Sequence, residues 1–115
     1  MSADYASLIA RGEVYVLPND ETAGVRGVLV MKPVDGALFI ENVAVEPRFQ
    51  GHGLGRQLMD YAERHAQAVG LNEIRLYTNE LMTENLAFYS RLGFVEVERR
   101  LDAGYRRVFM RKVLP

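Results

Sequence analysis

The residues with the clearest chemical potential are three glycines in the segment QGHGLG, residues 50–55. Gly51, Gly53 and Gly55 stand at alternate positions between an apolar run and a segment with helical periodicity. Glycine allows positive φ and lets a bulky anion approach the backbone. The first N–H groups of a helix lack an intrahelical acceptor, and the helix dipole makes that end positive. A strand, a glycine turn and a helix start therefore predict a phosphate-binding turn.

Two common phosphate-binding motifs do not match this turn. The nucleoside-triphosphatase loop G-x-x-x-x-G-K-[ST] fails because Arg56 and Gln57 follow Gly55. The dinucleotide fingerprint G-x-G-x-x-G fails because the glycines are spaced G-x-G-x-G, and because the strands before them are expected to be antiparallel. A third pattern, Q/R-x-x-G-x-G/A, is matched by Gln50, Gly53 and Gly55.

The segments that must position this turn predict a mixed α/β domain. Alternating apolar residues predict three strands in an antiparallel meander, over residues 13–17, 24–32 and 37–45. Turn residues separate them at 18–20 and 33–36. Apolar side chains at helical spacing then predict a helix over residues 54–69, which Gly70 ends.

The rest of the chain continues this alternation within a single domain, residues 1–115. The pattern predicts a strand, a short helix and a strand pair, over residues 73–78, 84–92, 94–101 and 105–114. Thr83 is expected to cap the short helix, with Glu84 near its positive end. Residues 7–11 are expected to end another short helix, closed by Gly12, ahead of the first strand.

Composition limits the class of protein. The chain has 115 residues, 49% of them hydrophobic and 25% charged, which is typical of one soluble globular domain. A net charge of -1 gives no overall attraction to nucleic acid or to an anionic membrane. The absence of cysteine excludes disulfides and thiolate chemistry. No signal-like segment and no apolar run of about 18 residues occurs, so a cytoplasmic protein is expected.

The glycine turn and its surroundings resemble the GNAT superfamily of N-acetyltransferases. In that family the pattern matched by Gln50, Gly53 and Gly55 binds a pyrophosphate. The preceding ENVAVEPRFQ is similar to the family's fourth strand and the turn after it. The later AFYSRLGF is similar to the helix that carries a tyrosine and ends at Gly-Phe. Together these motifs cover most of the chain, about residues 13 to 113, and are more specific than either alone.

The resemblance implies acetyl-coenzyme A as donor and a primary amine, in a small molecule or a peptide, as acceptor. The pyrophosphate would lie on the turn, and the pantetheine arm would run along the preceding strand. The implied cofactor-binding residues are Val43, Ala44, Val45, Gln50, Gly51, His52, Gly53, Leu54, Gly55, Arg56 and Asn85. The family often has asparagine where this chain has Met82 and alanine where it has Asn85, so Asn85 departs from the pattern.

The resemblance also implies the catalytic groups. Tyr89 matches the tyrosine that protonates the leaving thiolate. A backbone N–H near Val43 would stabilise the thioester oxygen as it becomes negative. Glu41 could take a proton from the incoming ammonium, directly or through water. Because Glu41 alternates with Phe39 and Val43, it is expected to share their apolar face, where burial would raise its pKa.

The same residues are consistent with other interpretations. The chain could be a non-catalytic acyl-coenzyme A-binding module, in which Tyr89 is a core residue, or it could acylate a hydroxyl group. Of the histidines, His52 is expected to act through its backbone and His65 to pack on the helix, so no metal site is expected. Arginine pairs at 99–100 and 106–107 alternate with acids, which favours a solvated hairpin face over nucleic-acid binding.

The resemblance also leads to an expectation about assembly. Family members begin with a strand and two helices, whereas few residues precede EVYVL here. We therefore expect EVYVL to be a bare sheet edge, with the charged YRRVFMRKVL at the opposite margin. A homodimer would cover the exposed edge and the gap beside the acceptor site. A monomer in which a helix over DYASLIA covers the gap is the alternative.

Overall fold

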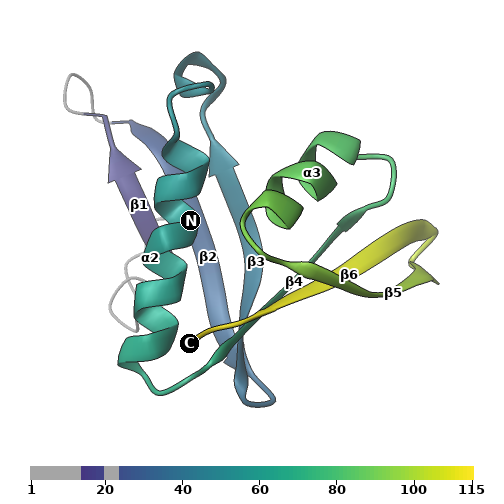
Figure 1. The fold of residues 1–115 in the computed structure, drawn as a ribbon. Helices are drawn as coiled ribbons and strands as arrows, with labels where there is room; N and C mark the ends of the chain where they lie inside the picture. Colours follow the sequence, from purple (N-terminus) through teal and green to yellow (C-terminus); the bar gives the residue numbers. More distant parts are fainter. Residues whose placement is uncertain (1–13, 20–23) are drawn as a thin grey trace.

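The computed structural model describes residues 14–19 and 24–115. They form one six-stranded sheet in the order β1-β2-β3-β4-β6-β5, with the helices on one face (Figure 1). The strands are β1 (Val14–Pro18), β2 (Val25–Val34), β3 (Ala37–Val45), β4 (Glu73–Asn79), β5 (Val95–Asp102) and β6 (Tyr105–Val113). The helices are the 3-10 turn η1 (Pro47–Phe49), α2 (Leu54–Ala68) and α3 (Thr83–Arg91). The mixed α/β fold is confirmed.

The first three strands form the predicted antiparallel meander. The β2–β3 connection is a two-residue turn in which Asp35 and Gly36 have φ values of 50° and 81°. Positive φ at both positions gives a turn whose twist matches that of the flanking strands. The turn therefore fixes the register of β3, the strand that leads into the glycine turn.

Helix α2 covers the meander with one apolar stripe. Its buried residues fall at helical spacing and are Leu54, Leu58, Met59, Ala62 and Ala66. The helix packs on β2, β3 and β4, where it meets buried side chains such as Leu29 and Leu38. Gly70, at φ 83°, follows its end as predicted. No helix in the described part of the chain is both long and apolar enough to cross a membrane.

The sheet opens between β3 and β4. These strands are parallel, but only Leu38 with Ile74 and Phe39 with Arg75 are paired. Beyond Phe39 the strands separate, and β4 pairs along its whole length with β6 instead (Figure 1). The second half of β3 therefore has no strand partner on its β4 side among the described residues.

The expected positions of the sheet margins are half right. β1 is an edge strand as predicted, but β6 lies inside the sheet between β4 and β5. The burial pattern gives the reason, because Val108 and Met110 of β6 are buried, whereas Val95 to Leu101 of β5 are exposed throughout. The β5 strand is thus the opposite margin, and the homodimer stays a prediction.

Two helix predictions have different outcomes. Helix α3 has Met82 as its N-cap residue, without a side-chain cap, so the prediction of Thr83 as cap is wrong. The Met82 carbonyl accepts the backbone N–H groups of Asn85 and Leu86, and the Met82 N–H donates to the Asn79 carbonyl, so the hydrogen-bonded series begins one residue before Thr83. Glu84 lies in the first turn as predicted. The helices expected over residues 7–11 and over DYASLIA lie outside the described residues.

The face of the sheet opposite the helices is called the helix-free face below. Successive strand residues point to opposite faces. Because Leu38 and Leu76 are buried beneath the helices, their neighbours Phe39 and Tyr77 lie on the helix-free face. None of the described helices covers these side chains.

Candidate functional site

The glycine turn has the backbone conformation that its sequence predicts. Gly51 and Gly53 have φ values of 84° and 79°, a region that residues with side chains rarely adopt. A Cβ atom built at either position would have no atom within 4 Å. The glycines therefore allow the backbone to adopt positive φ, and they also leave open space in front of the turn.

Helix α2 begins at this turn with free hydrogen-bond donors. Gly53 is the N-cap residue and supplies no side-chain cap. Its carbonyl accepts the N–H of Gln57 at 3.1 Å, so the N–H groups of the first turn precede the intrahelical series. No acidic side chain lies in that turn, whereas exposed Arg56 does. Donors, dipole and charge together favour an anion at this end of α2.

Side chains hold the turn against the end of β3. The Gln50 side-chain amide donates to the Val45 carbonyl at 3.2 Å. The Glu46 carboxylate accepts bonds from the backbone N–H and the Nε of Arg48, both at 3.2 Å. Gln50 therefore stabilises the loop, while its direct contact with a cofactor stays a prediction.

A hollow of about 210 Å³, called the turn hollow below, opens at this point. It is lined by Val45, Phe49, Gln50, Gly51, Gly53, Leu54, Gly55, Arg56 and Phe88. Two aromatic walls, Phe49 and Phe88, were not among the residues predicted from the sequence. Phe88 comes from α3, and the only sequence signal near it was the segment AFYSRLGF, which was singled out for Tyr89. A Cβ at Gly55 would lie 3.5 Å from Phe88 Cζ, an ordinary contact.

The predicted pantetheine strand is the half of β3 that leaves β4. Val43, Ala44 and Val45 pair with β2 through Leu29, Val28 and Gly27, and run toward the turn hollow. Their other edge faces the opening between β3 and β4. An extended ligand can bind such an edge as an added strand. The unpaired edge of residues 43–45 thus leads directly into the glycine turn, in which His52 is exposed.

The Tyr89 side chain packs against other aromatic rings, but its hydroxyl is accessible to solvent. The residue is 7% exposed, with the rings of Phe88 and Phe94 at 5.3 and 5.7 Å. None of the described residues bonds to its hydroxyl. Among residues 14–19 and 24–115 no buried side-chain oxygen lacks a hydrogen-bond partner, so this hydroxyl is not fully buried and solvent reaches it. Burial raises the pKa of Tyr89 above its ordinary value. The group therefore stays protonated at neutral pH and can donate a proton.

The prediction that Glu41 shares a buried face with Phe39 and Val43 is wrong. Val30 pairs with Asn42 and Met31 with Ile40, so Glu41 is an extra residue in a bulge. The bulge reverses the alternation, and Val43 packs on the core beneath the helices. Glu41 itself is exposed and forms an ion pair with Lys32 at 2.9 Å. Its role as a base stays a prediction.

Asn85 lies on α3, apart from the turn hollow. Its side-chain amide donates to Thr78 Oγ1 at 3.4 Å and contacts the Met82 sulfur at 3.6 Å. Thr78 is a buried residue of β4. Asn85 therefore connects α3 to β4, and cofactor binding by Asn85 stays a prediction.

The second histidine packs as predicted. His65 is half-buried on α2, with its ring 6.1 Å from that of Tyr61. Tyr61 in turn stacks on Tyr15 of β1 at 3.7 Å. Within residues 14–19 and 24–115, no three His, Asp or Glu side chains are grouped so that they could hold a metal ion.

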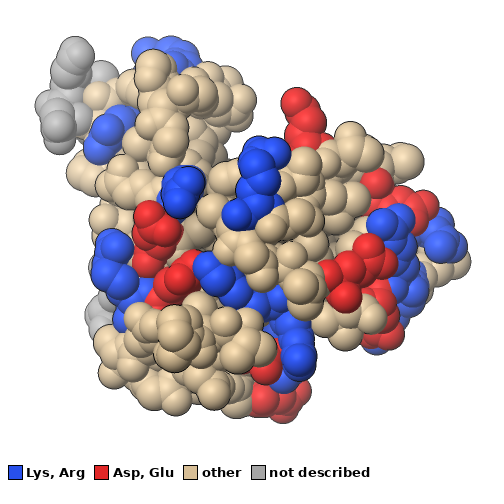
Figure 2. Space-filling view, in the orientation of Figure 1, with Lys and Arg blue, Asp and Glu red and all other residues tan. Residues whose placement is uncertain are grey.

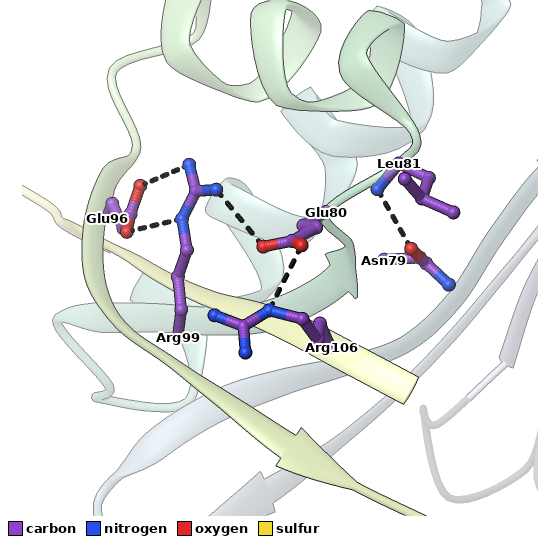
Figure 3. A network of polar contacts seen from close by, with 6 residues as sticks. All are labelled: Asn79, Glu80, Leu81, Glu96, Arg99 and Arg106. Atoms are coloured by element: carbon purple, nitrogen blue, oxygen red, sulfur yellow. Dashed lines mark hydrogen bonds and ion pairs between the residues drawn. The ribbon is translucent and has the colours of Figure 1, made fainter. Parts of the chain in front are cut away.

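An ionic network connects the end of β4 to the β5–β6 hairpin (Figure 3). The Glu80 carboxylate accepts from Arg106 Nε at 3.0 Å and from Arg99 at 3.4 Å. Arg99 also makes two bonds to Glu96, at 2.8 and 3.1 Å. The network lies immediately before α3, the helix that carries Tyr89.

The hairpin arginines have acidic partners, as the sequence predicts. Arg100 pairs with Glu98 at 3.0 Å, and Arg107 pairs with Asp102 at 3.1 Å. Figure 2 shows basic and acidic side chains next to one another over the hairpin, at the right of the view. The hairpin surface is therefore one of paired charges.

Comparisons with known proteins agree with this geometry. The sequence model of the acetyltransferase (GNAT) family matches residues 3–94. A mycothiol acetyltransferase of Catenulispora acidiphila is 41% identical over 64 residues, 56% of this chain and 20% of that protein. The N-acetyltransferase YvbK of Bacillus subtilis, described as uncharacterized, is 33% identical over 87 residues, 75% of this chain and 55% of that protein. The chain therefore spans only part of the length of these relatives.

A solved structure shows the same fold. A chain in the crystal structure of the NatC complex bound to Gag peptide and CoA matches with a TM-score of 0.81 and 21% identity. The match covers 98% of this chain and 79% of that chain.

Proposed function

Because the chain belongs to the acetyltransferase (GNAT) family, we propose that it transfers an acetyl group from acetyl-coenzyme A to a primary amine. The observation that supports this most directly is the turn hollow beside the opening between β3 and β4. An anion-binding helix start and an unpaired strand edge meet there, and Tyr89 lies on the helix whose Phe88 lines the hollow.

The residues present fit a pyrophosphate with an extended arm. Cβ atoms at Gly51 and Gly53 would project into open space, so the turn can accept phosphate oxygens closely. The first-turn N–H groups of α2 and the Arg56 side chain supply donors and positive charge. The backbone edge of residues 43–45 can bind the amides of a pantetheine arm. When bound, the donor supplies a thioester, which is already reactive toward a neutral amine.

The groups of the chain then have distinct roles in the proposal. A backbone N–H near Val43 polarises the thioester carbonyl as its oxygen becomes negative. The Tyr89 hydroxyl donates its proton to the departing thiolate, and its raised pKa keeps that proton in place at neutral pH. Glu41 is solvent-facing, so it accepts the ammonium proton through water.

Two measurements test the proposal. Coenzyme A should raise the melting temperature, because a ligand that binds only the folded state stabilises it. Acetyl-coenzyme A with a panel of amines should release free thiol above the rate without amine. A raised melting temperature without thiol release for any amine would instead identify a non-catalytic binding module. Release with alcohols but not amines would indicate a hydroxyl acceptor.

A further inference from the structure

A second hollow lies on the helix-free face of the sheet. This groove has a volume of about 370 Å³, and its walls include Val34, Phe39, Arg75, Val97 and Phe109. The volume is within the usual range of small-molecule sites. The turn hollow shares no residue with the groove. The proposed acetyl-coenzyme A site therefore does not account for this groove.

An aromatic row leads from the groove toward the opening between β3 and β4. Phe39, Tyr77 and Phe109 come from three neighbouring strands, with ring centres 5.9 and 5.4 Å apart and ring planes tilted by 39° and 49°. Tyr77 is 41% exposed, although it lies in the middle of the sheet. Exposed aromatic surface beside a groove is typical of a binding site.

The row lies at the point where β3 and β4 separate. Phe39 is the last residue of β3 that pairs with β4, and Tyr77 is two residues beyond its partner Arg75, on the β4 side of the opening. Val43, near which the thioester is proposed to bind, lies further along β3 on the other side of the same opening. A ligand whose ring binds on the row can therefore direct an alkyl amine into this opening.

The charges along the row favour a flat apolar group over a polycation. The Arg100 guanidinium lies 4.2 Å from the Phe109 ring centre, and that of Arg107 lies 4.3 Å from the Tyr77 ring centre. The nearby carboxylates of Glu98 and Asp102 are already paired with these arginines. Rings and guanidinium planes both stack on flat ligands. Free carboxylates for several ammonium groups are lacking among the described residues of this row.

We propose that the acceptor is an amine that carries a flat apolar group, such as an arylalkylamine, and that this group binds along Phe39, Tyr77 and Phe109. This inference rests on the proposed acetyl transfer, and it assigns the acceptor to the helix-free face. The amine would approach the thioester from this face, while the donor occupies the helix side.

Tryptamine is a suitable probe, because the chain contains no tryptophan and the indole emission therefore reports the ligand alone. The test variant is Tyr77→Thr, because threonine, like tyrosine, is favoured in strands. The control is Tyr105→Thr, since Tyr105 is 58% exposed on β6 and outside the row. We expect Tyr77→Thr to weaken tryptamine binding about three- to tenfold, and Tyr105→Thr to leave it unchanged.

Measuring thiol release distinguishes failure of the acceptor assignment from failure of the proposed acetyl transfer. In an active enzyme, kcat/KM for tryptamine should exceed that for spermidine and should fall in Tyr77→Thr, with coenzyme A binding unchanged. Equal tryptamine affinity in wild type and Tyr77→Thr, or a preference for spermidine, overturns the acceptor assignment alone. Absence of thiol release with every amine, despite tryptamine binding that depends on Tyr77, overturns acetyl transfer and with it the acceptor role of the groove.

Discussion

The two hollows lie on opposite sides of the same sheet and are built from different parts of the chain. The turn hollow is lined by the backbone of the glycine turn and the start of α2, with Phe49 and Phe88 as aromatic walls. The groove is formed by side chains of β2 to β6, with Phe39, Tyr77 and Phe109 beside it. A backbone surface binds a group common to many ligands, whereas a side-chain surface can be specific for one ligand class.

This difference matches the separate roles of donor and acceptor in the proposed acetyl transfer. The donor is the same molecule for every acceptor, so glycines and helix N–H groups are sufficient to bind it. The acceptor must be distinguished from other amines, and that requires side chains of defined shape. In the proposed reaction Tyr89 connects the two functions, because it would act only after both ligands are bound.

The largest effect is expected from Tyr89→Phe. The change keeps the ring among Phe88 and Phe94 and removes only the hydroxyl. General acid catalysis contributes about 10²–10⁴-fold, so kcat for thiol release should fall within that range. Coenzyme A binding, measured by calorimetry, should be unchanged. Tyr105→Phe, at an exposed tyrosine on β6, is the matched control and should keep full activity. Equal kcat in both variants would make Tyr89 a core residue only.

The same comparison explains how much could be predicted from the sequence. The turn hollow could be predicted from a short segment, because QGHGLG determines both the turn and the start of α2. The meander and the helices follow from apolar spacing in the same way. Phe88 could not be assigned, because its position in the hollow depends on where α3 packs.

The groove could not be predicted, because it depends on strand order. β6 lies between β4 and β5, and this order brings Phe109 next to Tyr77. The bulge at Glu41 was also hidden, because a sequence with regular alternation gives no sign of an extra residue. The groove therefore depends on long-range strand pairing, which the sequence alone does not reveal.

The next effect concerns the turn itself and compares two glycines in the same conformation. Gly53 and Gly36 have φ values of 79° and 81°, and a Cβ at either would contact nothing within 4 Å. Alanine at each should therefore cost a similar free energy of unfolding, about 1–2 kcal/mol. Only Gly53→Ala should lose most of the melting-temperature rise given by coenzyme A. If Gly36→Ala loses that rise equally, the loss comes from strain and not from the phosphate approach.

A smaller effect is expected at Gly55, where strain is absent. Gly55 lies in the first turn of α2, and an added Cβ would make an ordinary contact with Phe88. Alanine favours a helix over glycine, so the free energy of unfolding in Gly55→Ala should be unchanged or slightly higher. The affinity for coenzyme A, measured by calorimetry, should still fall several-fold, because the methyl group enters the turn hollow. Unchanged affinity would show that ligand does not approach this residue.

A further effect is expected in the alkaline dependence of stability. Burial raises the pKa of Tyr89 above the ordinary value of 10.0, so the folded state keeps this proton at a pH where the unfolded chain has released it. The free energy that protonated Tyr89 contributes to folding is fully present below pH 10. It is lost as the pH rises through the raised pKa of the folded state. Urea unfolding between pH 9 and 11.5 should therefore show a steeper loss for wild type than for Tyr89→Phe. The other tyrosines are common to both proteins and cancel.

The smallest effect is expected from the network at the end of β4. Glu80 accepts bonds from Arg99 and Arg106, but all three side chains are partly exposed, at 26%, 41% and 59%. Water and salt screen such pairs, so Glu80→Gln should lower the melting temperature less than Gly36→Ala does. The difference from wild type should shrink further at 1 M salt.

The position of Glu80 makes this small change informative for the two hollows. Its carboxylate joins the β5–β6 hairpin, which carries Phe109, to the turn that leads into α3. Coenzyme A affinity should be unchanged in Glu80→Gln, because the turn hollow makes no use of this network. KM for an arylalkylamine should rise modestly, since the hairpin is held less firmly. If coenzyme A affinity falls as well, the two hollows are coupled through α3.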